Sequence, residues 1–314
     1  MDLRSMLFVP GDSERKLAKA QGSGADALVL DLEDSVPADR IAAARSMVRE
    51  YLGNHRDRTR QQFWVRINPL PTDKALADLA AITGGAPDGI MLPKVDSGAD
   101  VVVADHYLSA LEIREGVEPG SIRIFAVATE TAPALFALGT FAGCSPRLAG
   151  MTWGAEDLSA ALGAATNRDE NGELEFTYRL ARSLCLAGAI AAGVQPLDTV
   201  FVDFRDSEGL RAESRAAARA GFTGKIAIHP DQVVTINQAF TPSAEEVAHA
   251  RRVIEAFSQG GHRGAGGQDA RHAASETGAT GSFPRGCGAL IDKRGQEMAL
   301  CAARLKCERE VKAL

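Results

Sequence analysis

Two carboxylates, Glu130 and Asp157, come after two successive apolar runs of the sequence, and the side chains around them suggest metal chemistry. Neither lies in a cluster of His or Cys residues. Carboxylates and small oxygen donors favour a hard cation, and Mg²⁺ usually takes only one or two protein carboxylates. We therefore predict that Glu130 and Asp157 bind Mg²⁺.

A second acidic cluster, Asp31, Glu33 and Asp34, competes with this pair, because it could bind metal through water or orient Arg66 and Lys94. A guanidinium such as Arg66 can bridge a structural carboxylate, or it can donate two hydrogen bonds to a developing enolate or a substrate carboxylate. Lys94 could instead form a Schiff base, as in a class I aldolase, although nearby acids disfavour a neutral amine.

Eight short apolar runs alternate with amphipathic stretches of helical spacing, and Gly and Pro mark the turns between them. This alternation predicts a (β/α)₈ TIM barrel rather than an open sheet. The expected strands are residues 6–9, 27–32, 63–67, 89–92, 122–128, 148–152, 199–202 and 225–228, and the expected helices include residues 14–21, 38–52, 75–82, 101–113 and 177–192.

The residues that follow these runs are rich in ionisable side chains of mixed sign, with Asp203 and Asp206 after the seventh run. In a TIM barrel the carboxyl ends of the strands form the mouth of the active site. Charges scattered over exposed loops would mean little, whereas charges that converge on one rim predict a catalytic centre there.

The sequence changes character after residue 240, so we expect a barrel domain over 1–240 and a C-terminal extension over 241–314. Ser243 is the expected N-cap of a helix that runs to about residue 257, with Glu246 at the capping-box position. Residues 258–287 have the composition of a flexible linker. Residues 288–314 can add a helix from about residue 296, as part of a helical lid.

The formal net charge of −6 argues against nucleic acid or an anionic membrane as a general partner. No apolar run approaches the ~20 residues that would span a bilayer, and the start of the sequence lacks the apolar stretch of a secretory signal. We therefore expect a cytoplasmic protein.

Nine ordered segments resemble the CoA-ester lyases of the HpcH/HpaI aldolase superfamily, which include the citrate lyase β subunit, malyl-CoA lyase and citramalyl-CoA lyase. The segments are LFVPGDSERKLAKA, DALVLDLEDSV, VRINP, GIMLPKV, ATETA, GAEDLSAALGA, DTVFVDFRDSEGL, GFTGKIAIHP and FTPS with EEVAHARRVIEAF. They cover roughly residues 4 to 257. A chance match of nine segments in order is very improbable.

The resemblance implies roles for residues at the barrel mouth. Glu130 of ATETA and Asp157 of GAED match the magnesium ligands of the family, and Arg66 of VRIN matches the arginine that contacts the acyl substrate and steadies the enolate. Glu33 and Asp34 match an acidic cluster beside them.

The resemblance also implies a binding site for the CoA ester. The usual arginine after the Pro-Gly turn is Ser13 here, so Arg15 is expected to serve instead. The residues expected to contact substrate or CoA, besides Arg66, are Phe8, Arg15, Lys19, Glu156, Ile228 and His229.

A catalytic base is implied in the C-terminal extension. The segment GALID, residues 288–292, resembles a lid motif whose Asp, contributed by a neighbouring subunit of a trimer, removes the α-proton of acetyl-CoA in the reverse reaction. Asp292 is therefore the expected base, with a solvated turn aspartate as the alternative. A homotrimer, or a hexamer built as a dimer of trimers, is expected.

The implied function is Mg²⁺-dependent cleavage of citramalyl-CoA or malyl-CoA to acetyl-CoA and a 2-oxo acid. One alternative is a citrate lyase β subunit that acts on a citryl thioester of an acyl-carrier protein. Another is a catalytically silent CoA-binding paralogue, since the tail is atypical. No motif reports which 2-oxo acid is released, because a methyl group is discriminated by only ~1–3 kcal/mol of pocket shape.

Overall fold

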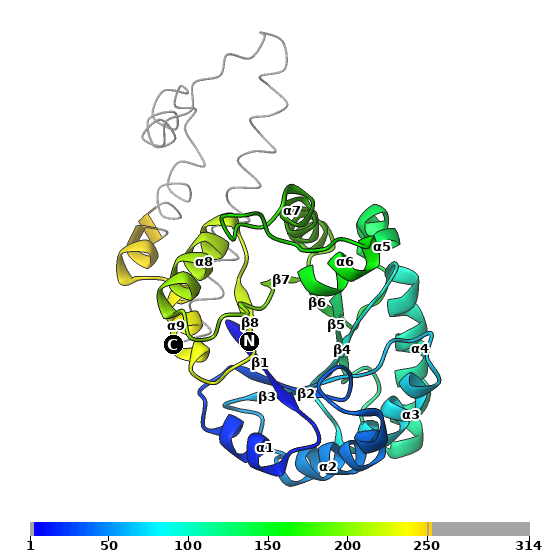
Figure 1. Ribbon diagram of the computed structural model, residues 1–314. Helices are drawn as coiled ribbons and strands as arrows, with labels where there is room; N and C mark the ends of the chain where they lie inside the picture. The colour runs from blue at the N-terminus through cyan, green and yellow to red at the C-terminus, as the bar shows by residue number, and fades with distance from the viewer. Residues whose placement is uncertain (1–2, 250, 253–314) are drawn as a thin grey trace, which may run out of the picture. The chain divides into compact units, whose positions relative to one another are not determined.

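The computed structural model describes residues 3–249 and 251–252, in which eight strands alternate with helices (Figure 1). The strands are β1 (Ser5–Pro10), β2 (Ala27–Asp31), β3 (Gln62–Arg66), β4 (Gly89–Leu92), β5 (Arg123–Val127), β6 (Leu148–Thr152), β7 (Gln195–Asp198) and β8 (Gly224–Ala227). The α-helices are α1 (Glu14–Gln21), α2 (Ile41–Asn54), α3 (Asp73–Ile82), α4 (Gly98–Glu115), α5 (Ala132–Ala137), α6 (Ala155–Leu162), α7 (Phe176–Ala191), α8 (Ser207–Ala220) and α9 (Gln232–Ala239). Short 3₁₀ turns span Ala38–Arg40, Thr83–Gly85 and Leu138–Phe141.

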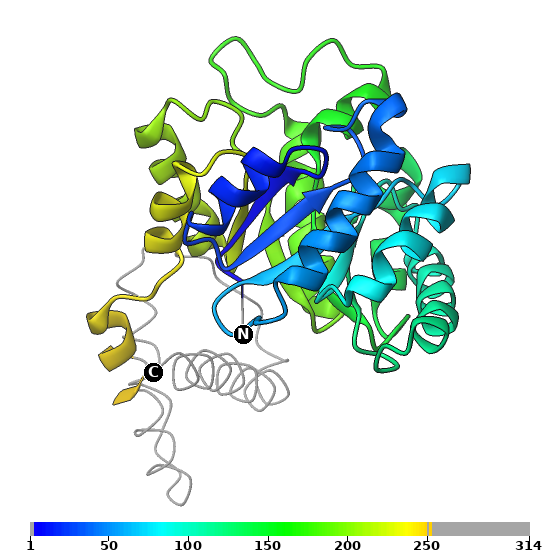
Figure 2. The ribbon, with the colours of Figure 1, turned by 90° about the horizontal axis from the view of Figure 1, so that it is seen from below.

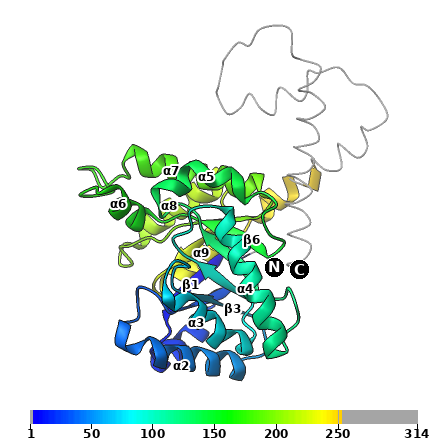
Figure 3. The ribbon, with the colours of Figure 1, turned by 90° about the vertical axis from the view of Figure 1, so that its right-hand side faces the viewer.

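The eight strands form a closed parallel barrel in sequence order, since β8 pairs with β1 through Ser5 and Lys225. The helices lie outside the strands (Figure 2), and α2, α3 and α4 follow one another around the barrel (Figure 3). Every connection between successive strands is thus a crossover that carries a helix back to the other end of the barrel. The predicted (β/α)₈ fold is confirmed.

Large side chains fill the inside of the barrel, because alternate residues of each strand point inward. Trp64 of β3 and Phe125 of β5 are 1% exposed and meet edge to face, with ring centroids 5.8 Å apart. Gly150 of β6 makes room for the second ring, since a Cβ there would lie 2.1 Å from the ring of Phe125. The barrel is therefore a packed core whose chemistry is confined to its mouth.

The seventh strand corrects the sequence prediction. Residues 199–202 were expected to form it, but β7 is Gln195–Asp198, and Val202 is 54% exposed. Residues 195–198 contain a proline and an aspartate, which are not typical of a buried strand, so the sequence pattern does not predict one there. The structure tolerates Asp198 because Lys225 and Arg182 pair with its carboxylate. Asp203 and Asp206 consequently lie in the loop before α8, where Asp206 caps that helix by accepting from the backbone N–H of Gly209 (2.9 Å).

The barrel unit ends at Thr241, and the described residues after it, 242–249 and 251–252, belong to a second unit. Ser243 and Glu246 form the predicted capping box: the backbone N–H of Ser243 donates to Glu246 Oε2 (2.8 Å), and that of Glu246 donates to Ser243 Oγ (3.2 Å). The expected linker and the segment with Asp292 lie outside the described residues. Within the described part of the chain, no helix is long and apolar enough to cross a membrane.

Candidate active site

Arg66 lies at the end of β3, in register with Asp31 at the end of β2. Its Nε and Nη2 donate to the two carboxylate oxygens of Asp31, both at 2.6 Å, and its Nη1 faces Glu33 (2.8 Å) and Asp34 (3.2 Å). Burial alone would raise the pKa of Asp31, but the bonds from Arg66 hold it below its usual range. Asp31 thus takes two of the five N–H donors of the guanidinium and fixes its orientation.

Asp31 also shapes the loop that follows β2. Its carboxylate accepts hydrogen bonds from the backbone N–H groups of Glu33 (3.0 Å) and Ser35 (3.1 Å), which places the Glu33 and Asp34 side chains beside Arg66. Of the two functions open to the acidic cluster, orienting Arg66 and Lys94 is therefore the one that the contacts display.

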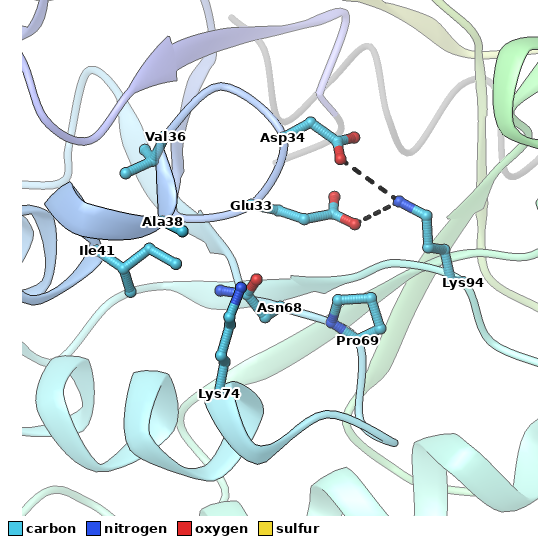
Figure 4. Close-up of a pocket in the computed structure, with 9 residues that line it drawn as sticks. All are labelled: Glu33, Asp34, Val36, Ala38, Ile41, Asn68, Pro69, Lys74 and Lys94. Atoms are coloured by element: carbon cyan, nitrogen blue, oxygen red, sulfur yellow. Dashed lines mark hydrogen bonds and ion pairs between the residues drawn. The ribbon is translucent and has the colours of Figure 1, made fainter.

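Glu33 and Asp34 both point toward the ammonium group of Lys94 (Figure 4). The Nζ atom of Lys94 lies 2.5 Å from Glu33 Oε1 and 3.6 Å from Asp34 Oδ1. Burial raises the pKa of Glu33 even though Arg66 and Lys94 oppose the shift. A hollow of about 340 Å³ adjoins this cluster, lined by Glu33, Asp34, Val36, Ala38, Ile41, Asn68, Pro69, Lys74 and Lys94.

Lys94 connects this cluster to the expected metal ligands. Its backbone N–H donates to Glu130 Oε2 (2.6 Å), and its Nζ lies 3.2 Å from Asp157 Oδ1. Burial alone would lower the pKa of Lys94, but the surrounding carboxylates hold it above its usual range. An ammonium held in its charged form is no nucleophile, so the Schiff-base alternative for Lys94 is not supported.

Glu130 follows β5 and is 6% exposed, whereas Asp157 lies in the first turn of α6 and its side chain is 32% exposed. Gly154, the N-cap of α6, lets the two segments approach, because a Cβ there would lie 2.7 Å from Glu130 Cγ. Burial, with a contribution from the like charge of Asp157, raises the pKa of Glu130 to about 8.

These two carboxylates fit a hard divalent cation. They supply only oxygen donors, and the negative charge of Asp157 disfavours the charged form of Glu130 unless positive charge lies between them. Among residues 3–249 and 251–252, no group of three or more His, Cys, Asp and Glu side chains is arranged to hold a metal. Mg²⁺ is usually held by one or two protein carboxylates, while water and substrate occupy its other coordination positions.

The residues expected to contact CoA lie on neighbouring segments, because β1 pairs with β8. The ring of Phe8 packs under the guanidinium of Arg66, whose Cζ lies 4.6 Å from the ring centroid. Arg15 and Lys19 are exposed on α1, and Ile228 and His229 follow β8 directly. Five of the six residues therefore belong to β1, the helix after it, or the segment after the paired strand β8, whereas Glu156 is exposed on α6 beside Asp157.

Two residues at this edge were not predicted from the sequence. Phe204 stacks on the ring of His229, with centroids 4.8 Å apart and planes 20° apart. Buried Gln232 accepts from the backbone N–H groups of Ile228 (2.9 Å) and His229 (3.2 Å) and donates to the carbonyl of Phe201 (2.8 Å), so it ties the loops after β7 and β8 together. The sequence offers a signal for Phe204, which lies within the segment DFRDSEGL of the family resemblance. It offers none for Gln232, because nothing distinguishes this residue from other helical glutamines.

Comparisons with known proteins place the chain among CoA-ester lyases and their relatives. The model of the HpcH/HpaI aldolase/citrate lyase family matches residues 4–230. The chain is 37% identical over 280 residues to an L-malyl-CoA/beta-methylmalyl-CoA lyase of Cereibacter sphaeroides, which covers 84% of this chain and 86% of the relative. It is also 37% identical to a (3S)-malyl-CoA thioesterase of the same species, with the same coverage of both chains.

Solved structures are similar too. The CitE protein of Mycobacterium tuberculosis, in complex with magnesium, acetoacetate and coenzyme A, has a TM-score of 0.68 and 35% identity, covering 85% of this chain and 91% of its own. The citrate lyase β subunit of the same species, complexed with oxaloacetate and magnesium, has a TM-score of 0.65 and 34% identity, with 77% of this chain and 98% of its own covered.

A closed barrel with a carboxylate pair and a half-buried arginine at its mouth, in a chain that matches this family model, defines a TIM-barrel enzyme of the carbon–carbon lyase class. The chain belongs to the HpcH/HpaI aldolase/citrate lyase family.

Proposed function

We propose that this protein is a Mg²⁺-dependent lyase that cleaves a 3-hydroxyacyl-CoA, of citramalyl-CoA or malyl-CoA type, to acetyl-CoA and a 2-oxo acid. The observation that carries the proposal is that Lys94 contacts both Glu130 and Asp157 while Arg66 lies in the same ionic cluster. The malyl-CoA lyase relatives and the magnesium complexes of the similar structures support it.

The chemistry assigned to the residues follows from their positions. A bound Mg²⁺, held by Glu130 and Asp157, would supply the positive charge that polarises the oxygens of the 3-hydroxy acid. The hydroxyl proton passes to solvent water, the carbonyl of the 2-oxo acid forms as the carbon–carbon bond breaks, and the electron pair of that bond moves onto the α-carbon of the thioester to give its enolate. Arg66, oriented by Asp31, donates a hydrogen bond to the enolate oxygen that forms.

We assign the protonation of the enolate carbon to Asp292, which also removes the α-proton in the reverse direction. Asp292 lies outside the described residues, and its assignment rests on the resemblance of the segment GALID to a lid motif. The homotrimer or hexamer and the cytoplasmic location expected from the sequence stay predictions of the same kind.

The experiment that tests the reaction incubates the purified protein and Mg²⁺ with citramalyl-CoA, malyl-CoA and citryl-CoA, and quantifies acetyl-CoA and the 2-oxo acid. Formation of both products in equal amounts supports the lyase. Condensation of acetyl-CoA with pyruvate, glyoxylate or oxaloacetate identifies the preferred 2-oxo acid. Turnover only with a citryl thioester of an acyl-carrier protein would instead favour the citrate lyase β subunit, and binding without any turnover would favour the silent paralogue.

Thioester hydrolysis is a second candidate activity, because relatives named (3S)-malyl-CoA thioesterase are 36–37% identical to the chain. The two reactions differ in their products. Hydrolysis of malyl-CoA releases malate and a free thiol, whereas cleavage releases glyoxylate and leaves the thioester intact. Thiol release measured beside glyoxylate release in one reaction mixture therefore separates the two.

The metal assignment is tested with Glu130→Ala, for which we expect Mg²⁺ dependence and activity to be lost together. Glu50→Ala is the matched control, since Glu50 is an exposed glutamate of α2, and it should retain wild-type activity. A Glu130→Ala protein that stays active in the presence of EDTA would refute the metal site.

A further inference from the structure

Lys94 has an unusual position in the site, since it contacts both expected metal ligands through different parts of the same residue. Its backbone N–H donates to Glu130 Oε2 at 2.6 Å, and its Nζ lies 3.2 Å from Asp157 Oδ1. Its contacts with Glu130 and Asp157 point to a function in the metal site.

The backbone of Lys94 adopts a left-handed conformation, with φ of 52°. Within the described residues, Ala86 is the other non-glycine residue with positive φ. This conformation is unfavourable for a residue with a Cβ, and such residues gather at functional sites, where surrounding contacts hold them in place. Here the left-handed turn directs the N–H of Lys94 at Glu130, so the strained residue orients that carboxylate.

The side chain of Lys94 puts a positive charge beside the second ligand. Its ammonium lies between Glu33 and Asp157, and its side chain is 28% exposed. Asp157, at 32% exposed, is the more accessible of the two expected ligands. A carboxylate oxygen that faces an ammonium binds a metal ion less tightly, because the two cations repel each other at short range in a partly desolvated site.

We propose that Lys94 sets the affinity of this site for its divalent cation: its backbone N–H holds Glu130 in place, and its ammonium competes with the cation for Asp157. The proposal rests on the magnesium site of the proposed function and adds to it a residue that regulates occupancy. Lys94 acts through the ligands and is therefore a positioning residue.

The test measures Mn²⁺ binding by electron paramagnetic resonance in the absence of substrate, so that turnover plays no part. Lys94→Met removes the charge while keeping the length of the side chain and the same left-handed backbone cost. We expect it to bind Mn²⁺ at least about tenfold more tightly, equivalent to about 1.4 kcal/mol. Lys94→Arg keeps the charge and should stay within about threefold of the wild type.

Lys74→Met is the matched control, because Lys74 lines the hollow beside Glu33 and Asp34 (Figure 4) but makes no side-chain ion pair among the described residues. It removes the same charge near the mouth without touching Asp157, so its Mn²⁺ affinity should change by less than about threefold. Lys94→Gly removes the charge and relieves the left-handed backbone. It should also bind Mn²⁺ more tightly and serves if the methionine variant does not fold.

Unchanged or weaker Mn²⁺ binding in both Lys94→Met and Lys94→Gly would overturn this proposal while leaving the metal site in place. An equal gain in Lys74→Met would also overturn it, because the effect would then come from net charge rather than from the contact with Asp157. Failure of the wild-type protein to bind Mn²⁺ would overturn the metal site and this proposal together.

Discussion

The guanidinium of Arg66 is held in one orientation by the residues around it. Its guanidinium is held by Asp31 on one edge, faces Glu33 and Asp34 on another, and packs on the ring of Phe8. These contacts restrict its rotation before any ligand arrives. Fixed donors stabilise developing charge better than mobile ones, because they need no reorganisation at the moment of reaction.

At the residue scale we predict that Asp31→Asn lowers kcat by about 10- to 100-fold while Mn²⁺ affinity stays within a few-fold of the wild type. The amide keeps the shape of the side chain but loses the charge that pairs with Arg66. Steady-state kinetics and metal binding are measured on the same preparation. Equal losses in kcat and in metal affinity would show that Asp31 supports the metal ligands instead.

The residues of the site lie on elements of different kinds. Arg66 and Asp31 end adjacent strands, whereas Glu130 lies three residues beyond β5 and Asp157 lies on the short helix α6. The two metal-site carboxylates therefore depend on the packing of a loop against the start of α6, and Gly154 forms that contact.

At the element scale Gly154→Ala should weaken Mn²⁺ binding by about tenfold or more, because the added Cβ would lie 2.7 Å from Glu130 Cγ and must push the two segments apart. Binding is measured by electron paramagnetic resonance and folding by thermal melting. Gly53→Ala in α2 is the control, since a Cβ there meets nothing within 4 Å. It should be neutral or stabilise the helix by up to about 1 kcal/mol.

A buried cluster of charged side chains links β7 and β8 on the outer face of the barrel. Asp198 accepts hydrogen bonds from Trp153 Nε1 (2.8 Å), Arg182 Nε (2.9 Å) and Lys225 Nζ (2.9 Å). Burial alone would raise the pKa of Asp198, but Lys225, Arg182 and Trp153 lower it to about 2. The strand that contradicts the sequence prediction is thus stabilised by partners distant in the sequence.

This cluster predicts a pH dependence of stability. The pKa of Asp198 in the folded state, about 2, lies below the unfolded value of about 3.9. Its contribution is therefore complete above about pH 4 and is lost as the pH falls through about 2. We expect Asp198→Asn to cost about 3 kcal/mol at pH 7, and the difference from wild type to shrink by about 2 kcal/mol toward pH 2.

Urea unfolding monitored by Trp fluorescence measures this effect, because Trp153 donates to Asp198 and is one of only two tryptophans in the chain. A difference between the variant and the wild type that stays constant from pH 7 to pH 2 would contradict the assignment.

At the scale of the whole molecule, the barrel supplies the metal site and the arginine, and the C-terminal extension is expected to supply the base. If Asp292 comes from a neighbouring subunit, each active centre is built from two copies of the chain. Such a centre can be restored by mixing two inactive variants whose defects lie on opposite sides of the interface.

We predict that Asp292→Ala abolishes exchange of the acetyl-CoA α-proton but leaves Mn²⁺ and CoA binding intact. Co-expression of Asp292→Ala with Glu130→Ala should then recover part of the wild-type exchange, because some mixed oligomers contain one intact centre. Exchange is followed by NMR in deuterated water. No recovery from verified mixed oligomers would place the base in the same subunit as the metal, and unchanged exchange in Asp292→Ala alone would remove its assignment as base.

The sequence by itself determined the barrel and the positions of its mouth residues. Local apolar periodicity and the turns between runs predict parallel strands, and seven of the predicted strands overlap those observed, with ends shifted by at most about one residue. Glu130, Asp157 and Arg66 could be located because each follows or ends such a run. The family resemblance then assigned them chemistry that position alone left open.

Only the tertiary structure decided which groups meet. The pairing of Asp31 with Arg66 depends on the register of β2 against β3. The contact of Lys94 with Glu130 depends on a left-handed backbone, which a lysine at position 94 does not indicate. The seventh strand was misplaced for the same reason. Asp198 is stable there because Lys225 and Arg182, remote in sequence, neutralise it. Such contacts are non-local, and local pattern carries no information about them.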